Sequence, residues 1–279
     1  MTSPVRCAVL GDPVDHSLSP VLHRAAYDAL GLAQWSYDAV RVPAGTLATF
    51  LDGLDDSWRG LSLTMPLKRE LLPLAGEVSE RARLVGAANT LVLGPDVPVG
   101  GLADNTDLPG AAAAVRERWA GAVADVVVLG GGATAASTAL ALCDLGATRV
   151  RILARAPERA ADTVAAVAAH PGRPDVQALA LPDARVRADV VVSTVPVAAQ
   201  VPALLDRIEA PVVFEVLYDP WPTPLAAATL ERGAVLVGGL DLLVHQAALQ
   251  VALFTGREAP LETMRQAGER ALRERSGRP

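Results

Sequence analysis

Residues 64–68, Thr-Met-Pro-Leu-Lys, contain the only lysine of this 279-residue chain. The chain has 25 lysine and arginine residues, so the other 24 are arginines. Arginine stays protonated in proteins, whereas a lysine ammonium can release a proton near neutral pH. Lys68 is therefore a candidate for proton transfer in catalysis. The local stretch leaves a second interpretation open, in which Lys68 is an ordinary surface residue.

Asparagine is almost as rare as lysine. Asn89 and Asn105 are the only two copies, and each precedes a threonine. Such residues at turns often bond only their own backbone. The side chains that could join them in a site are Ser17, Ser19, Thr64, Lys68 and Asp107. This set holds no obvious nucleophile–base triad, and it suits a small polyhydroxylated carboxylate rather than a fatty or aromatic substrate.

A glycine-rich turn predicts a dinucleotide site. Residues 129–137, LGGGATAAS, follow the apolar run DVVVL, open a predicted helix and give the spacing Gly130-x-Gly132-x-x-Ala135. The first glycine permits a tight turn, the second lets the backbone approach a pyrophosphate, and the helix N-terminus faces the phosphates. The predicted cofactor-binding residues here are Gly130, Gly131, Gly132, Ala133 and Thr134. The alternative is a flexible turn.

The residues after the next predicted strand, at 149–154, favour NADP over NAD. An NAD site usually has a carboxylate here that accepts from the ribose hydroxyls. This chain has ILARAPER, with Arg155 and Arg159 and no carboxylate before Glu158. Guanidinium groups can hold a 2′-phosphate. The alternative is a solvated face on an arginine-rich protein.

The alternation of apolar segments along the chain predicts the strands and helices that position these residues. From residue 125 onward, Val-rich runs alternate with Ala-rich stretches of helical length: DVVVLG, RVRILA, VQALAL, ADVVVST, PVVFEVL and AVLVGG. Continuous apolar strands alternating with helices indicate a parallel sheet covered on both faces. A second α/β series precedes residue 110, and LDLLVHQAALQVALFTG with the charged tail after it predicts C-terminal helices.

Composition excludes several classes of protein. The chain is 51% hydrophobic and 20% charged, as in globular proteins, and its net charge of −6 argues against nucleic-acid or anionic-membrane partners. Cys7 and Cys143 lie in apolar runs and suggest no disulfide or zinc site, and the four histidines show no metal-ligand spacing. We expect no metal.

No targeting segment is evident at the N-terminus. Residues 126–143 lack charge, but the glycines at 130–132 favour a strand, turn and helix over a membrane span. We expect a soluble cytoplasmic protein.

Several motifs together resemble the shikimate dehydrogenase family. They occur in the family's order over nearly the whole chain: GDPVDHSLSPVLH at 11–23, SLTMPLK at 62–68, GAANT at 86–90, DNTDLPG at 104–110, YDPWPTPL at 218–225 and GLDLLVHQAA at 239–248. The resemblance implies catalytic roles for Lys68 and Asp107. The substrate-binding residues that it implies are Ser17, Ser19, Thr64, Asn89, Tyr218 and Gln246. It also implies that Thr194 and Gly239 lie near the nicotinamide.

The resemblance implies a two-domain α/β fold. A substrate-binding domain would comprise residues 1–108 and 240–279, and a Rossmann-like NADP-binding domain would comprise residues 109–239. The implied reaction is the reversible NADPH-dependent reduction of 3-dehydroshikimate to shikimate in chorismate and aromatic amino-acid biosynthesis. Lys68 would donate and accept the proton, and Asp107 would orient it. Substrate would lie between the domains, in a monomer or homodimer.

Three alternatives stay open. They are a quinate/shikimate dehydrogenase that uses NAD, a dehydrogenase of a modified shikimate, and a non-catalytic dinucleotide-sensing relative. The chain also departs from the family pattern. Ser62 replaces the asparagine that usually opens the lysine motif, Ala103 replaces a glycine, STVP at 193–196 replaces a stretch resembling Asn-Ala-Thr-Ser, and Ala154 and Ala156 flank Arg155 where the NADP pattern is Asn-Arg-Thr.

Overall fold

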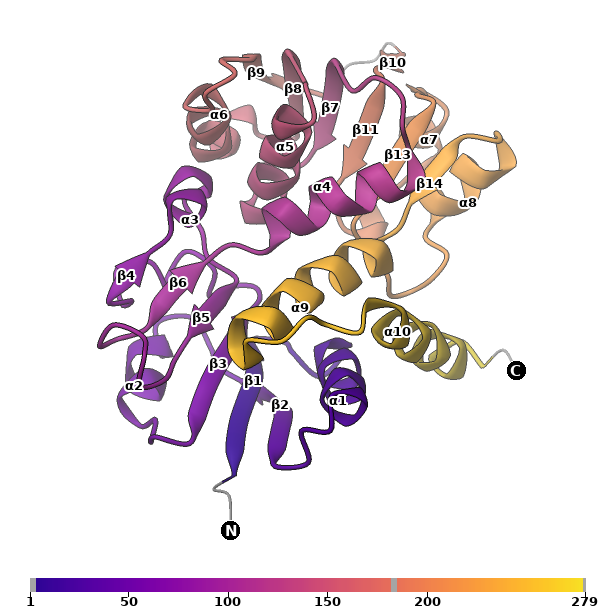
Figure 1. Cartoon of the computed structure of the whole chain (residues 1–279). Helices are drawn as coiled ribbons and strands as arrows, with labels where there is room; N and C mark the ends of the chain where they lie inside the picture. Colours follow the sequence, from indigo (N-terminus) through magenta and orange to yellow (C-terminus); the bar gives the residue numbers. More distant parts are fainter. Residues whose placement is uncertain (1–3, 182–184, 278–279) are drawn as a thin grey trace. The chain divides into compact units, whose positions relative to one another are not determined.

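The computed structural model describes residues 4–181 and 185–277. The chain divides into two compact units (Figure 1): Met1–Thr106 with Leu243–Pro279, and Asp107–Leu242. The boundaries predicted from the sequence for the substrate-binding and dinucleotide-binding domains, 108/109 and 239/240, stay a prediction. The predicted α/β fold class is confirmed, because each unit combines a six-stranded β-sheet with α-helices.

The first unit contains a mixed six-stranded sheet in the order β2-β1-β3-β5-β6-β4. Strand β1 (Val5–Gly11) pairs in parallel with β2 (Trp35–Arg41) and β3 (Trp58–Leu63), and β5 (Thr90–Val92) runs antiparallel to β3 and to β6 (Leu102–Asp104). A short strand, β4 (Glu77–Val78), completes the sheet beside β6. The carboxyl ends of the parallel strands β1 and β3 therefore meet at one edge of the sheet.

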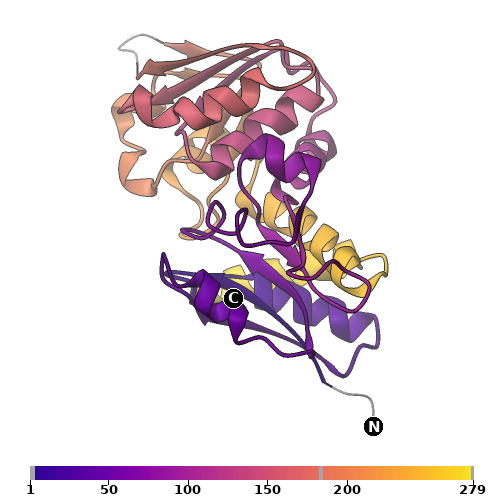
Figure 2. The ribbon, with the colours of Figure 1, turned by 90° about the vertical axis from the view of Figure 1, so that its left-hand side faces the viewer.

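The helices of this unit are α1 (Ser19–Ala29), α2 (Leu47–Asp52), α3 (Glu80–Val85), the part of α9 (Gly239–Thr255) from Leu243 onward, and α10 (Leu261–Arg275). Helix α10 packs against α1, so the yellow C-terminal helices lie with the indigo N-terminal elements in both views (Figures 1 and 2). Helix α3 begins at a capping serine, Ser79, whose hydroxyl accepts from Ala82 N at 3.1 Å, and it ends at the left-handed Gly86.

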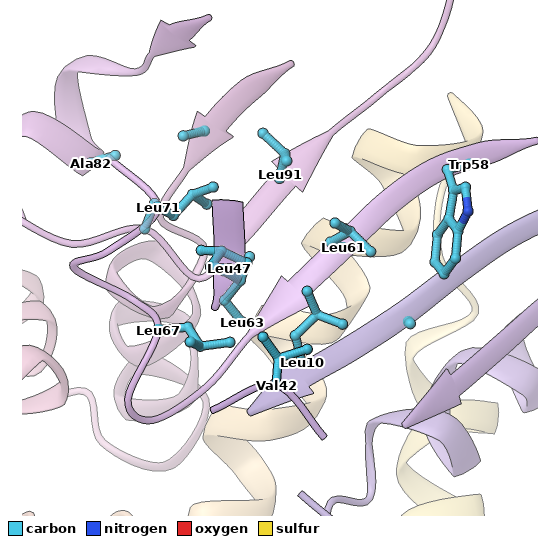
Figure 3. Close-up of a cluster of buried hydrophobic side chains, with 13 residues drawn as sticks. Leu10, Val42, Leu47, Trp58, Leu61, Leu63, Leu67, Leu71, Ala82 and Leu91 are labelled. Carbon is cyan, nitrogen blue, oxygen red and sulfur yellow. The ribbon is translucent and has the colours of Figure 1, made fainter. Parts of the chain in front are cut away.

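The core of the first unit is built from leucines on one face of this sheet. Leu10 and Leu61, from the parallel strands, are fully buried in one cluster with Leu67, directly before Lys68, and Leu71, three residues after it (Figure 3). Burying a leucine side chain stabilises a fold by about 1.5–3 kcal/mol. The segment that carries Lys68 is thus anchored on both sides by buried side chains.

The second unit contains an all-parallel six-stranded sheet in the order β14-β13-β11-β7-β8-β9. Its strands are β7 (Asp125–Leu129), β8 (Arg149–Ala154), β9 (Asp175–Ala180), β11 (Val190–Ser193), β13 (Val212–Glu215) and β14 (Val235–Val237). Numbered along the chain, this is the doubly wound order 3-2-1-4-5-6 of dinucleotide-binding folds. The order reverses between β7 and β11, so a ligand site is expected at their carboxyl ends.

The helices of the second unit are α4 (Asp107–Arg118), α5 (Ala133–Asp144), α6 (Ala161–Ala168), α7 (Pro202–Leu205), α8 (Pro224–Glu231) and the start of α9, with 3-10 turns η1 (Pro157–Ala160) and η2 (Val197–Ala199). Short strands β10 (Val186–Arg187) and β12 (Ile208–Glu209) pair separately. Valines and leucines of the central strands are buried, whereas the edge strand β9 is mostly exposed. No helix within the described residues is long and apolar enough to cross a membrane.

Candidate active site

Lys68 lies on a turn at the carboxyl end of β3. Thr64 N donates to the carbonyl of Leu10 at 2.9 Å, which joins the turn to the end of β1, and Leu67 N donates back to Thr64 O at 2.8 Å. The Lys68 carbonyl accepts from Ala88 N at 2.7 Å. The lone lysine is half-buried and is held beside the GAANT segment that carries Asn89. The first unit therefore brings Thr64, Lys68 and Asn89 to the same edge of its sheet.

The two predicted substrate-binding serines lie at the start of α1. Ser19 N donates to Ser17 Oγ at 3.2 Å, and this bond fixes the entry of the chain into the helix. Ser19 is buried next to the hydroxyl of Tyr37 on β2, whereas Ser17 is half-buried. Burial raises the pKa of the Tyr37 hydroxyl well above its usual range, so Tyr37 stays protonated.

Asn89 and Gln246 meet in a buried cluster. Asn89 Nδ2 donates to Gln246 Oε1 at 3.1 Å and to Thr106 Oγ1 at 2.9 Å, and Asn89 Oδ1 accepts from Thr106 N at 2.8 Å. Gln246 Nε2 donates to Leu243 O at 3.1 Å. Two carboxamides that are 157 residues apart, one directly before β5 and one on α9, are thus brought together.

Asn105 has a structural partner in the same unit. Its Nδ2 donates to Ala87 O at 2.9 Å, and its backbone N–H donates to Asp104 Oδ1 at 2.8 Å. Asp104 also accepts from Ser79 Oγ at 2.6 Å and forms an ion pair with Arg81. Hydrogen bonds from these groups oppose the effect of burial and lower the pKa of Asp104. The strand that ends before Asp107 is therefore anchored by a buried carboxylate.

Asp107 follows directly as the first residue of α4 and is buried. It begins the second unit, whereas Lys68 belongs to the first. The pairing of Lys68 with Asp107 stays a prediction from the sequence.

The glycine-rich turn of the second unit leaves no room for side chains at two positions. A Cβ on Gly130, whose φ is +105°, would lie 2.3 Å from Thr194 Oγ1, and one on Gly131 would lie 2.6 Å from Ala160 Cβ. A Cβ on Gly132 would meet nothing within 4 Å. Gly132 caps α5, whose first residues are the predicted Ala133 and Thr134. The open space above Gly132 fits the close approach of a pyrophosphate to the backbone.

Two hydroxyls hold this turn in place. Thr194, after β11, donates to Leu129 O at 2.9 Å, and Thr163, on α6, donates to Gly131 O at 2.9 Å. Thr194 thus lies at the point where the strand order reverses. Sequence reasoning missed Thr163, which is fully buried in an Ala-rich helix whose pattern gives no sign of the contact.

Arg155 and Arg159 follow the end of β8, and both are exposed. Neither has an ion-pair partner among residues 4–181 and 185–277. Most other arginines of this unit form ion pairs, for example Arg149 with Asp125 at 2.6 Å. Two unpaired guanidinium groups at this strand end fit a phosphate on the adenosine ribose.

Tyr218 and Gly239 lie where two backbone segments touch. A Cβ on Gly239 would be 2.3 Å from Val216 O and 2.5 Å from Leu217 O, so only glycine fits beside the segment that leads to Tyr218. Tyr218 is half-buried. The structure therefore places Gly239 against the two residues that precede Tyr218.

Glu215, at the end of β13, is a buried carboxylate that sequence reasoning missed. It accepts from Gln200 Nε2 at 2.6 Å, Leu217 N at 3.0 Å and Thr223 Oγ1 at 3.2 Å. Burial outweighs these bonds and raises the pKa of Glu215 from 4.5 to about 7. Its bonds bracket the segment that contains Tyr218. The single charge within the apolar run PVVFEVL was the available signal.

Comparisons with known proteins identify the chain. A shikimate dehydrogenase (NADP(+)) of Moorella thermoacetica is 34% identical to this chain over an alignment of length 283. The alignment covers 97% of this chain and 93% of that protein. This chain belongs to the shikimate dehydrogenase family. The family predicted from the motifs is thereby confirmed.

Family models and solved structures agree with this membership. The model of the shikimate dehydrogenase substrate binding domain matches residues 9–91, that of the shikimate 5′-dehydrogenase C-terminal domain matches residues 239–267, and one described as NADP oxidoreductase coenzyme F420-dependent matches residues 125–213. The Mycobacterium tuberculosis shikimate dehydrogenase structure has a TM-score of 0.85 and 40% identity, covering 96% of this chain and all of that one. The structure of a Thermus thermophilus shikimate 5-dehydrogenase, solved in complex with NADP(H) and shikimate, has a TM-score of 0.83 and 31% sequence identity. The match covers 96% of this chain and all of that one.

Ser62, where the family's lysine motif usually has an asparagine, forms two buried hydrogen bonds. It is buried on β3, accepts from Tyr37 Oη at 2.5 Å and donates to Gln250 Oε1 at 2.8 Å. Tyr37 and Gln250 were both missed from the sequence.

Within the described residues, no three His, Cys, Asp or Glu side chains are grouped so that they could hold a metal ion.

Proposed function

We propose that this protein interconverts shikimate and 3-dehydroshikimate with NADP, and that Lys68 is the proton donor and acceptor, assisted by Asp107. As predicted, the chain is an NADP-dependent oxidoreductase acting on a CH–OH group. The observation that carries the finer proposal is the 2.7 Å bond from Ala88 N to Lys68 O, which holds the lone lysine one residue from Asn89 and its partner Gln246. This bond supports the proposal because it ties the backbone of Lys68 to the segment whose next residue, Asn89, is proposed to bind a ring hydroxyl.

The residues of the second unit fit NADP. Gly130, Gly131 and Gly132 with the start of α5 would hold the pyrophosphate, and Arg155 and Arg159 would hold the 2′-phosphate. When bound, NADPH supplies the hydride that reduces the ring ketone.

Lys68 acts on the ketone oxygen. As negative charge develops there, the ammonium of Lys68 stabilises it and transfers a proton to form the hydroxyl, and the amine accepts that proton in the reverse direction. Asp107 would orient the ammonium and favour its charged form. Ser17 and Ser19 would bind the carboxylate of the substrate, and Thr64, Asn89, Tyr218 and Gln246 would bind its hydroxyls and ring. Such contacts hold the reacting oxygen at Lys68.

The test is reduction of NADP⁺ by the purified protein, followed by absorbance, with shikimate and quinate offered separately and NAD⁺ in parallel. Turnover with shikimate and NADP⁺ supports the proposal. Turnover only with quinate or NAD⁺ would move the protein to the broader quinate/shikimate branch, and binding of NADP⁺ without turnover of any cyclohexane acid would point to a sensor. Cytoplasmic localisation, a role in chorismate biosynthesis and a monomeric or homodimeric state are part of the same proposal.

A further inference from the structure

Gln250 is a buried glutamine that the proposed mechanism does not use. It lies on α9 four residues after Gln246, so the two side chains share one face of the helix. Gln250 is fully buried and Gln246 is 6% exposed. A glutamine at 0% exposure is uncommon unless its amide is fully paired.

All four hydrogen-bonding positions of the Gln250 carboxamide face polar groups. Nε2 donates to Thr90 Oγ1 at 2.9 Å and to Asn89 O at 3.1 Å. Oε1 accepts from Ser62 Oγ at 2.8 Å, and His23 Nε2 lies 3.4 Å away. The side chain thereby ties α9 to β3, β5 and α1 at the edge of the sheet where the predicted substrate residues gather.

These bonds determine which atom of Asn89 faces Gln246. A threonine hydroxyl has one proton. Thr90 Oγ1 accepts from Gln250 Nε2 and donates its proton to Asn89 Oδ1, at 2.9 Å, which is closer than the Thr106 hydroxyl at 3.3 Å. With Oδ1 filled by Thr90 and by Thr106 N, the Asn89 amide protons are directed to Gln246 and Thr106. The orientation of Asn89 is thus set by the backbone N–H of Thr106 and, through Thr90, by Gln250.

The same direction of donation extends back to the predicted carboxylate-binding serine. Ser62 donates to Gln250 and accepts from Tyr37 Oη, at 2.5 Å, and the Ser19 side chain lies next to the Tyr37 hydroxyl and opposes the rise of its pKa by burial. His23 stacks on Tyr37 with ring centroids 3.9 Å apart, and burial lowers its pKa to about 3, so it is neutral. His23 Nδ1 has no partner within the described residues, which leaves Nε2 to carry the proton toward Gln250.

We propose that Gln250 is a positioning residue for the hydroxy acid: through Thr90 it fixes the carboxamide of Asn89, and through Ser62 and Tyr37 it couples Asn89 to Ser19. The inference rests on the proposed function. A glutamine that merely completes a polar core would stabilise the fold alone. A positioning glutamine also sets the affinity for the hydroxy acid, because the two ends of its network are residues predicted to bind that substrate.

The composition of the chain gives a direct readout of Asn89. Selective ¹⁵N-asparagine labelling yields side-chain amide signals from Asn89 and Asn105 only, and an Asn105→Ser variant assigns them. In Gln250→Met, which keeps the length of the side chain and removes its hydrogen bonds, we expect the Asn89 pair to shift. The Asn105 pair, bonded to Ala87 O, should stay in place. Gln266→Met, at an exposed glutamine of α10, is the matched control.

Kinetics with the same variants complete the test. Gln250→Met should raise KM for shikimate about tenfold, the effect of one lost buried hydrogen bond, with KM for NADP⁺ unchanged. Thr90→Val keeps the shape of the relay residue and should reproduce both effects. The double variant should add nothing further, because the two changes break one path. If Gln250→Met does not fold, Thr90→Val decides alone.

Three results would overturn the inference. They are unmoved Asn89 signals, a shift of those signals with an unchanged KM for shikimate, and an equal rise in both KM values accompanied by a fall in Tm. Absence of turnover in the parent protein would instead refute the proposed function and the substrate role of Gln250 with it, while the amide signals would still decide whether Gln250 orients Asn89.

Discussion

The backbone carbonyl of Lys68 accepts a hydrogen bond from Ala88 N at 2.7 Å, so the only lysine of the chain is fixed to the segment that carries Asn89. Asn89 in turn donates to Gln246, which lies on helix α9. The residues that we propose to transfer the proton and to bind the ring hydroxyls are thus joined by hydrogen bonds within the first unit.

Replacing either unpaired arginine after β8 should weaken NADP specifically. We expect Arg155→Ala or Arg159→Ala to raise KM for NADP⁺ by roughly tenfold, the effect of one lost charge-assisted hydrogen bond, and to leave KM for NAD⁺ nearly unchanged. Arg270→Ala, at an exposed position on α10, is the control. Equal changes for the two cofactors would show that these arginines do not recognise the 2′-phosphate.

Two neighbouring glycines should respond differently to alanine. Gly132→Ala meets no atom within 4 Å, so the variant should keep the parent's Tm but bind NADP⁺ more weakly, because the new methyl occupies the space left for the pyrophosphate. Gly131→Ala places its Cβ 2.6 Å from Ala160 Cβ and should lower stability by about 1–3 kcal/mol. Thermal unfolding and cofactor titration separate the two effects. Undiminished NADP⁺ binding by Gly132→Ala would contradict the assignment.

Glu215 should make stability depend on pH. Its pKa is raised from 4.5 to about 7 in the folded protein, so the folded state binds the proton more tightly than the unfolded state. The stability that it contributes is complete below about pH 4.5 and is lost as the pH rises through about 7, by about 3 kcal/mol. Glu215→Gln, which cannot ionise, should lack this loss.

The measurement for Glu215 is the unfolding free energy of parent and variant between pH 5 and pH 8. The difference between them should change steadily over this range, with the parent losing stability relative to Glu215→Gln. Parallel curves would show that the carboxylate is already ionised or that its ionisation is not coupled to folding.

The cofactor half of the site is the part that the sequence predicts best. Its signals are local: a Val-rich strand, the Gly130–Gly132 turn and a helix follow one another directly, and Arg155 follows the next strand. Each step depends on residues within about ten positions, where strand periodicity and turn chemistry act. The resulting order of strands and the contact of Thr194 with the turn then follow from the rules of doubly wound sheets.

The polar network behind Asn89 was not predictable in the same way. Ser62 and Gln250 are 188 residues apart, and their bond depends on α9 returning to a sheet built from the N-terminus. Gln250 lies in an apolar helix whose pattern predicts only core packing. Tyr37 lies on β2, whose alternating sequence WSYDAVR is typical of a strand but does not indicate the partner of the Tyr37 hydroxyl. Long-range packing, which local pattern does not encode, decides these contacts.

The most direct test of the account is kcat for NADP⁺ reduction by shikimate in the parent, Lys68→Ala and Lys68→Arg. If Lys68 transfers the proton, alanine should lower kcat by roughly 10²–10⁴-fold, and arginine should be almost as poor because it keeps the charge but does not readily release a proton. Unchanged thermal unfolding of each variant would exclude misfolding as the cause. An arginine variant with most of the parent's kcat would contradict the account, because charge alone would then suffice at this position.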